Sequence, residues 1–288
     1  MGVRKIERAL LESIRRLDIA RGDTVLVRAA MHAVGPLPNG PRSLIDAFLE
    51  VISQDGTLVS LSFTESSYLK KPDPNKPFRS DTPTYAGAFP ATMLTYPEAK
   101  RSTHPTCSYV AIGKHAELIT GNHSPNSPAY EPVRTIIDLN GKMVLVGCVQ
   151  SSPGFTTTHL AEYDLGLLNR VILPWLNAVY YEAEDGTIKL FRRKDLGLCS
   201  RSFYKFYSYY VAAGILRTGM IGNAYSIAAP AQETYAIEKS ILKMHPTFNV
   251  CDDPLCKLCN SRRWDRLHRI PIYILMRLAR KLERVLSH

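Results

Sequence analysis

His159 and Glu162 are the residues of this chain whose types and spacing most clearly suggest chemistry. They lie three positions apart in THLAEY (residues 158–163), so on a helix they would share one face. A neutral imidazole accepts a proton near neutral pH, and a nearby carboxylate orients the ring and favours the imidazolium that forms. The pair predicts a general base. The spacing alone would also fit a histidine that is bonded locally at a helix terminus.

A second group of reactive side chains lies in HPTFNVCDDPLCKLC, which begins at residue 245. Its spacing, H-x5-C-x4-C-x2-C, offers four ligands for a tetrahedral zinc site, and C-x2-C is the usual knuckle spacing. The predicted ligands are His245, Cys251, Cys256 and Cys259. Cys199 or His268 could replace His245 as the fourth ligand, and the alternative is a set of free structural thiols.

The composition indicates a folded protein, with 288 residues of which 45% are hydrophobic and 22% are charged. The net charge of +10 is uneven, because residues 262–288 contribute +6 of it. The first residues lack the apolar core of a signal peptide, and no apolar stretch approaches the roughly 20 residues that a membrane span needs. We therefore expect a cytoplasmic location without a transmembrane helix.

The elements that must position His159 alternate between helices and strands. The pattern predicts helices over residues 3–17, 41–52 and 85–94 and strands over residues 24–27, 57–63, 108–112 and 143–147, with a hairpin over 177–191. A polar loop follows the strand at 143–147, and a helix begins near Thr157 or Thr158. This order predicts an α/β fold with a mixed sheet and flanking helices.

Two further segments have a distinct character. Residues 68–83 hold four prolines and no periodicity, so they form either a lid over a site or a solvated connector. Residues 272–286 place an apolar stripe beside several basic residues, which is the pattern of a basic amphipathic helix. Such a helix either contacts an anionic membrane surface or docks on its own domain or on a homodimer partner. We expect a main domain over residues 1–240 and a C-terminal segment over 241–288.

Several blocks of the chain, in order, resemble the aminoglycoside 3-N-acetyltransferase family. They are DGTLVSLSF (residues 55–63), TPTYAGAFP (82–90), RSTHPTCSYVAIG (101–113), SPAYE (127–131) and GKMVLVGCVQ (141–150) running into THLAEY. The resemblance implies direct transfer of an acetyl group from acetyl-CoA to an amine, with His159 as the general base and Glu162 as its partner. A base is needed because a protonated ammonium has no lone pair with which to attack a thioester.

The resemblance also implies where the substrates bind. The family has a His-Ser-Ser-Leu segment after its first strand, whereas this chain has Ala29 and Ala30 in place of the serines. Backbone amides do not depend on side-chain identity, so CoA binding is still expected there. The expected CoA-binding residues are Ala30, Met31, His32, Arg101, Ser102 and His104, although RSTHP would also fit a simple turn. The expected acceptor-binding residues are Tyr68, Thr156 and Tyr163.

The charge of the predicted lid bears on the acceptor. Its residues 68–81 hold four bases and two acids, which would repel a polycationic aminoglycoside and attract an anion. We therefore expect an amino sugar carried on a nucleotide or lipid diphosphate, as in surface-glycan biosynthesis, with an aminoglycoside antibiotic as the alternative. A hypothesis of another class is a binding module with a zinc knuckle, a basic tail and a vestigial transferase site. No specific nucleic-acid partner is expected.

Overall fold

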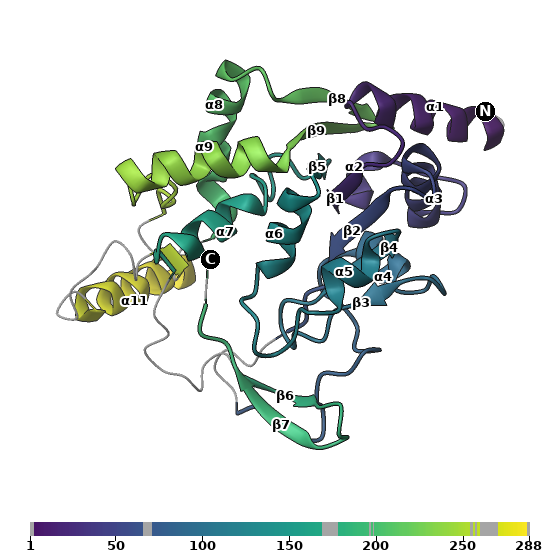
Figure 1. Ribbon diagram of the computed structural model, residues 1–288. Helices are drawn as coiled ribbons and strands as arrows, with labels where there is room; N and C mark the ends of the chain where they lie inside the picture. The colour runs from purple at the N-terminus through teal and green to yellow at the C-terminus, as the bar shows by residue number, and fades with distance from the viewer. Residues whose placement is uncertain are drawn as a thin grey trace.

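The computed structural model describes residues 3–65, 71–168, 178–195, 197, 199–253, 256, 258–259 and 270–286. Within these residues the main element is a seven-stranded sheet in the order β3-β4-β2-β1-β5-β9-β8 (Figure 1). Its strands are β1 (Thr24–Ala29), β2 (Thr57–Leu61), β3 (Lys100–Arg101), β4 (Tyr109–Gly113), β5 (Lys142–Val146), β8 (Arg217–Ile221) and β9 (Ala224–Pro230).

The three central strands β2, β1 and β5 pair parallel, and each outer strand pairs antiparallel with its neighbours. Leu26 of β1 is in register with Val59 of β2 on one side and with Met143 of β5 on the other. β4 and β9 then pair antiparallel with β2 and β5. The central strands are buried runs of apolar residues, as expected where helices cover both faces of a sheet. The predicted mixed sheet is confirmed.

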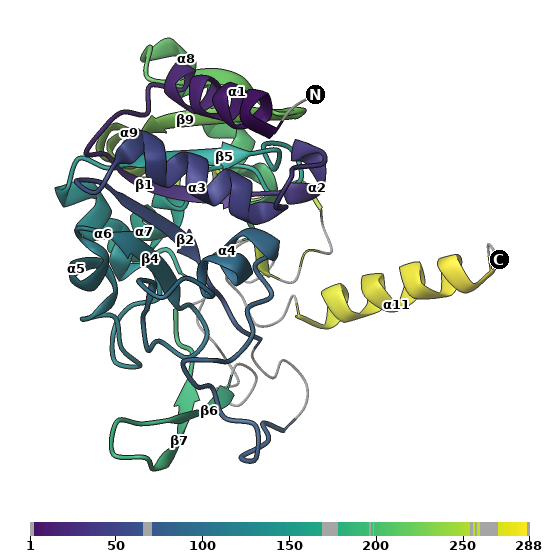
Figure 2. The same ribbon diagram turned by 90° about the vertical axis from the view of Figure 1, so that its right-hand side faces the viewer.

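Helices cover both faces of this sheet (Figure 2). One apolar cluster joins a face of the sheet to α1 (Val3–Arg16), α3 (Pro41–Ile52) and α4 (Ala88–Met93). The other cluster joins the opposite face to α5 (Ala116–Thr120), α6 (Glu131–Asp138), α7 (Thr157–Asp164), α8 (Tyr207–Ala212) and α9 (Ala231–Met244). The short helix α2 (Met31–Val34) follows β1, and a 3-10 helix (Ser200–Phe206) precedes α8. The helix that carries His159 belongs to this second cluster, where it packs against α9 and α6.

The predicted hairpin is present as β6 (Ala178–Glu182) and β7 (Ile188–Arg192), which extend away from the main sheet (Figure 1). Phe78, in the segment expected to be a lid, pairs with this hairpin through its backbone. Its N–H donates to the Tyr180 carbonyl (2.7 Å), and its carbonyl accepts from the Glu182 N–H (3.0 Å). At Phe78 the described part of that segment therefore pairs with the hairpin as a short additional strand would.

The last helix, α11 (Ile270–Leu286), projects away from the sheet and its helices (Figure 2). Three of its leucines are strongly exposed: Leu275 by 65%, Leu278 by 53% and Leu282 by 62%. The basic helix predicted for this region is present. Those leucines are not buried against the described part of the chain, whereas Arg280 of the same helix lies 4.0 Å from Asp253. The self-docking alternative stays a prediction. No helix in the described ranges is long and apolar enough to cross a membrane. The division at residue 240 stays a prediction.

Candidate active site

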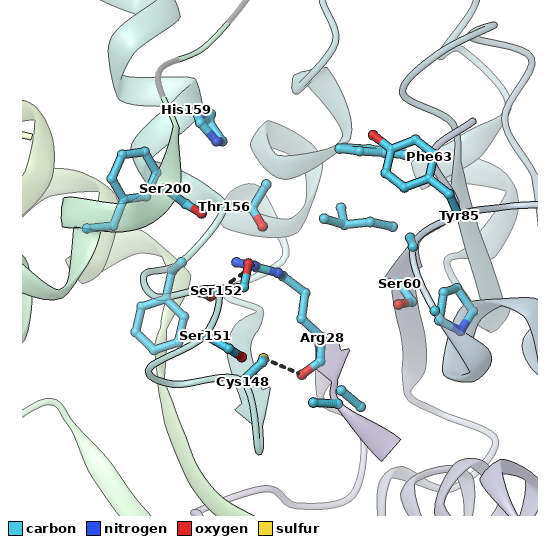
Figure 3. Close-up of a pocket in the computed structure, with 18 of the residues that line it drawn as sticks. Arg28, Ser60, Phe63, Tyr85, Cys148, Ser151, Ser152, Thr156, His159 and Ser200 are labelled. Carbon is cyan, nitrogen blue, oxygen red and sulfur yellow. Dashed lines mark hydrogen bonds between the residues drawn. The ribbon is translucent and has the colours of Figure 1, made fainter. Parts of the chain in front are cut away.

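A cavity of about 830 Å³ opens where the three parallel strands end (Figure 3). Its walls include residues 28–32 at the end of β1, residues 60, 61 and 63 at the end of β2, and residues 148, 151, 152, 155 and 156 after β5. Because the carboxyl ends of parallel strands meet at one edge of a sheet, loops distant in sequence converge there, and ligands of α/β proteins commonly bind at this edge. His159, near the start of α7, lies at the side of the cavity.

His159 and Glu162 form the pair that the sequence predicts. His159 Nδ1 lies 2.8 Å from Glu162 Oε2, and the imidazole is 15% exposed while the carboxylate is fully buried. If Nδ1 donates to this carboxylate, Nε2 keeps the lone pair and can accept a proton from a ligand. The carboxylate then fixes the tautomer and stabilises the imidazolium, which is the arrangement that a general base needs.

Aromatic rings and a glycine fix the position of the imidazole. The ring of Tyr130 stacks on His159 with centroids 4.6 Å apart, and Phe203 meets it edge-on at 4.9 Å. A Cβ added to Gly197 would lie 2.4 Å from His159 Nδ1 and 3.2 Å from Glu162 Oε2. The backbone at Gly197 therefore packs directly on the pair and leaves no room for a side chain there.

Glu162 is held from its other side by Asn249. The Asn249 amide Nδ2 donates to Glu162 Oε1 over 2.7 Å, and both residues are fully buried. A buried carboxylate is costly unless donors satisfy its oxygens. The contact therefore both stabilises Glu162 and fixes the plane in which it meets His159.

A second buried carboxylate lies behind the same helix. Glu238 Oε1 accepts hydrogen bonds from Thr158 Oγ1 (2.7 Å) and Tyr210 OH (2.5 Å). Burial raises the pKa of Glu238 to about 8, against the opposing effect of these donors. Thr156 differs from Thr158, because its buried hydroxyl has no hydrogen-bond partner among the described residues and lies on the cavity wall. A substrate could supply that partner, as the sequence analysis expects of Thr156.

The segment after β1 lines the cavity as expected, since Ala30, Met31 and His32 are all on its wall. Arg28 also lines the cavity, and its guanidinium donates to the carbonyls of Gly154 (2.8 Å) and Ser152 (3.0 Å). These bonds tie the end of β1 to the loop that leads into α7. The nearby thiol of Cys148 is buried, which raises its pKa and makes it a poor nucleophile.

Arg101, Ser102 and His104 do not line this cavity. The Arg101 guanidinium donates to the carbonyls of Ser62 (3.0 Å) and Ser80 (2.9 Å), and burial lowers its pKa to about 10. These bonds join the lid segment to β2. Arg101 therefore holds these two segments together, and its expected role at the cofactor stays a prediction.

The two residues that follow have similar internal roles. Ser102 Oγ accepts from the Tyr109 N–H (2.9 Å), and His104 Nδ1 accepts from the Cys107 N–H (3.0 Å). The His104 ring stacks on His123 with centroids 4.8 Å apart, and burial, with His123 adding to it, lowers the pKa of His104 to about 2. The turn before β4, which the sequence analysis kept as the alternative, is what RSTHP forms.

The remaining acceptor residues are placed differently. Tyr163 points to a separate cavity of about 540 Å³ beside the β6–β7 hairpin, where it lies with Asp195 and Lys194. Tyr68 lies outside the described residues. Of the two acceptor residues that the structure describes, Thr156 and Tyr163, only Thr156 lines the cavity that holds His159.

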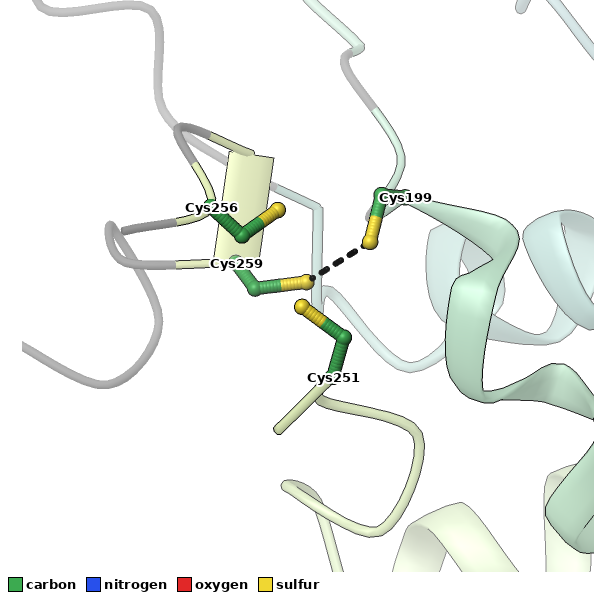
Figure 4. Close-up of side chains that lie close together, drawn as sticks. All are labelled: Cys199, Cys251, Cys256 and Cys259. Atoms are coloured by element: carbon green, nitrogen blue, oxygen red, sulfur yellow. Dashed lines mark hydrogen bonds between the residues drawn. The ribbon is translucent and has the colours of Figure 1, made fainter. Parts of the chain in front are cut away.

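The cysteines come together without His245. The Sγ atoms of Cys199, Cys251, Cys256 and Cys259 all lie within 4.8 Å of one another (Figure 4). His245 instead ends α9 as an exposed C-cap, with its N–H donating to the Ile241 carbonyl (2.8 Å). His245 therefore does not join the cysteines, and Cys199, which the sequence analysis kept as a replacement, lies with the other three. His268 lies outside the described residues.

Sequence reasoning missed Gly197, Phe203 and Asn249 because they follow the blocks on which the resemblance rests. Tyr130 lies in SPAYE, one of the family-like blocks, but the sequence predicted no function for it. The only signal that could have pointed to these residues was their nearness in sequence to cysteines: Gly197 precedes Cys199 by two positions and Asn249 precedes Cys251 by two.

Known proteins resemble this chain in sequence. The sequence model of the family described as "Aminoglycoside 3-N-acetyltransferase" matches residues 26–243. The aminoglycoside N(3)-acetyltransferase III of Salmonella sp is 27% identical over 267 residues, covering 83% of this chain and 91% of that protein. The aminoglycoside N(3)-acetyltransferase IV of Salmonella sp is 33% identical over 156 residues, covering 53% and 57%.

Solved structures share the fold. The apoenzyme of aminoglycoside acetyltransferase AAC(3)-IVa superposes with a TM-score of 0.74 at 25% identity, covering 89% of this chain and 96% of that one. AAC-IIIb, solved as a binary complex with CoASH, gives a TM-score of 0.71 at 25% identity, covering 83% and 96%. The extent of the family match, together with the shared fold, shows that this chain belongs to the aminoglycoside 3-N-acetyltransferase family and is an N-acetyltransferase.

Proposed function

We propose that this protein transfers an acetyl group from acetyl-CoA directly to an amine of an amino-sugar compound, with His159 as the general base. The observation that carries the proposal is the imidazole fixed by Glu162 at 2.8 Å beside the cavity. The amine nitrogen attacks the thioester carbonyl and gives its proton to His159 Nε2. The new C–N bond forms as the C–S bond breaks, and the imidazolium of His159 then returns the proton to the sulfur, so that CoA leaves as the thiol.

The cofactor side of the cavity would be the segment from Ala30 to His32. Met31 and His32 are the first residues of α2, so their backbone amides have no carbonyl partner within the helix and would bind the pantetheine arm or the developing oxyanion. CoA is the ligand of the related AAC-IIIb structure, which supports acetyl-CoA as the co-substrate. The absence of the two serines makes backbone amides the main donors.

The relatives favour an aminoglycoside as the acceptor, which the sequence analysis ranked second. The curated relatives are named for acetylation of aminoglycosides at N3. Thr156, with its unpartnered hydroxyl on the cavity wall, would accept or donate a hydrogen bond to a sugar hydroxyl or amine. Acetylation of a panel of aminoglycosides, followed by release of the CoA thiol, would test this acceptor class.

A second acceptor class, an anionic amino-sugar conjugate of the kind used in glycan biosynthesis, is favoured by the charge of the cavity. The described residues that line it include Arg28 and Arg201 but no Asp or Glu. A polycation would gain no direct ion pair from these walls, whereas a phosphate would. The same assay with nucleotide-linked amino sugars separates the two classes. A kcat/KM that is at least tenfold higher for one class identifies it, and activity with neither contradicts both.

We also propose that α11 contacts an anionic membrane surface from the cytoplasmic side. Leu275, Leu278 and Leu282 are exposed, and residues 262–288 carry a charge of +6. An apolar face among basic residues suits an anionic lipid surface. The full chain should sediment with anionic liposomes, whereas a Leu278→Glu/Leu282→Glu variant and a chain that ends before residue 262 should not. Concentration-dependent dimerisation without lipid binding would instead indicate a homodimer contact.

A further inference from the structure

Four cysteine sulfurs converge from two distant parts of the chain (Figure 4). Cys199 precedes the 3-10 helix at Ser200–Phe206, whereas the other three follow α9. The Cys199 and Cys259 sulfurs lie 3.4 Å apart, and all four lie within 4.8 Å of one another. Zinc bound by four thiolates at about 2.3 Å needs sulfurs roughly 3.8 Å apart at tetrahedral angles, which this cluster matches closely.

The burial and chemistry of the cluster also suit a metal. Cys251, Cys256 and Cys259 are buried, and Cys199 is half-buried, so the group is largely shielded from solvent. A set of four sulfur ligands in a tetrahedron selects zinc or iron, and oxygen-preferring cations are excluded by it. Four protein ligands leave no open coordination position, which is the property of a structural site and not of a catalytic one.

We propose that Cys199, Cys251, Cys256 and Cys259 bind a structural zinc ion that fixes the back of the active site. Each of the two loops that meet at the metal also touches the catalytic pair. Gly197, two residues before Cys199, packs against His159, while Asn249, two residues before Cys251, donates to Glu162. The zinc ion would hold these two loops at a fixed separation.

Other contacts join the same two loops. Lys205 Nζ donates to the Val250 carbonyl (3.3 Å) and lies 3.2 Å from Asp252, and Arg201 pairs with Asp253 at 3.2 Å. These ion pairs are largely exposed, so each contributes little. Cys199 and Leu258 line the cavity itself. A metal at the cluster is therefore the strongest available link between the cavity wall and the C-terminal segment.

The metal can be tested on the full chain without an activity assay. Protein purified without chelator should contain one zinc ion per chain by elemental analysis. Replacement by Co²⁺ should give the visible absorption bands of tetrahedral cobalt thiolate together with a thiolate-to-metal charge-transfer band. Iron in place of zinc, or a Cys199–Cys259 disulfide in metal-free protein, would overturn the proposal.

Substitutions locate the site. Cys199→Ser and Cys256→Ser should each lower the zinc content at least tenfold, whereas Cys107→Ala, a buried cysteine outside the cluster, should retain one zinc ion per chain. Circular dichroism of each variant shows whether the main domain is folded. Full zinc content in folded Cys199→Ser protein would contradict the role of Cys199.

The link to catalysis rests on the proposed function and has its own readout. Removal of zinc by a chelator should lower kcat at least tenfold while the KM for acetyl-CoA changes less than threefold. The reason is that the loops at the metal contact His159 and Glu162 and not the segment from Ala30 to His32. Readdition of zinc should restore kcat. Stoichiometric zinc in a protein without acetyltransferase activity would contradict the proposed function but support the metal site. An active protein without metal would contradict the metal site but support the proposed function.

Discussion

Asn249 donates a 2.7 Å hydrogen bond to Glu162 across 87 residues of sequence. Glu162 in turn contacts His159 at 2.8 Å, so the C-terminal part of the chain determines how the proposed base is held. The contact explains how a helix of eight residues can fix an imidazole precisely enough for catalysis: its partner carboxylate is held from both sides.

Replacing Asn249 should impair catalysis more than substrate binding. A hydrogen bond to a charged group contributes about 1.5–3 kcal/mol, so Asn249→Ala should lower kcat by roughly 10–100-fold. Asn249→Asp should be worse, since it places a second carboxylate beside Glu162. Steady-state kinetics measure both, with the exposed Asn75→Ala as the matched control. Wild-type kcat in folded Asn249→Asp protein would show that this contact is not needed.

A methyl group at Gly197 should displace the base. The added Cβ would lie 2.4 Å from His159 Nδ1, so the ring must move, and a displacement of about 1 Å can cost roughly 100-fold in rate. The expected result for Gly197→Ala is a comparable loss of kcat with little change in melting temperature. Gly219→Ala is the control, because a Cβ there would meet only Leu17 at an ordinary 3.4 Å. Equal kcat in the two variants would contradict the packing described here.

Glu238 should make stability depend on pH. Its pKa is about 8 in the folded protein, compared with 4.5 for the group in water, so the folded state binds more protons between these values. The stabilisation is fully present below about pH 4.5 and is lost as the pH rises through 8, by an amount on the order of a few kcal/mol. Urea unfolding at several pH values measures the slope.

Glu238→Gln should flatten this slope between pH 4.5 and 8, because the amide cannot ionise. The exposed Glu50→Gln is the control and should keep the wild-type slope. An identical slope in Glu238→Gln and in the wild type would mean that Glu238 does not titrate in this range.

Arg101 should matter for stability and not for the cofactor. Its guanidinium joins the carbonyls of Ser62 and Ser80 and lies outside the cavity that holds His159. Arg101→Ala should therefore lower the free energy of unfolding by roughly 1.5–3 kcal/mol, the contribution of a charged hydrogen bond, and leave the KM for acetyl-CoA within twofold. Arg79→Ala is a control for the loss of one positive charge, because Arg79 is exposed on the lid segment and, among the described residues, forms a single ion pair, with Glu182. A tenfold rise in this KM would restore Arg101 to the cofactor site.

The sequence was most informative where the relevant contacts are local. His159 and Glu162 share one helix, so their spacing alone places them together, and the buried strands follow from apolar runs between turns. Asn249 and Gly197 meet the same pair only through tertiary packing, and no local pattern encodes contacts of that kind. Cys199 joins its cluster from a position 60 residues before Cys259 for the same reason.

Arg101 and His104 show that residue type alone does not determine which partners a side chain contacts. Their residue types suit a phosphate site, but whether a guanidinium faces a ligand or backbone carbonyls depends on which loops pack beside it. Here the Pro-rich segment turns back over β2, and its carbonyls take up the donors of Arg101. Burial of His104 against His123 likewise follows from the turn between β3 and β4, which a sequence pattern does not position.

The most direct test of the account is the rate of CoA thiol release by His159→Ala, compared with the wild type, at saturating acetyl-CoA with the best acceptor found. Loss of a general base should lower kcat by roughly 10²–10⁴-fold, while acetyl-CoA binding measured by calorimetry stays unchanged. Wild-type kcat in the folded variant would contradict the assignment of His159 as the base.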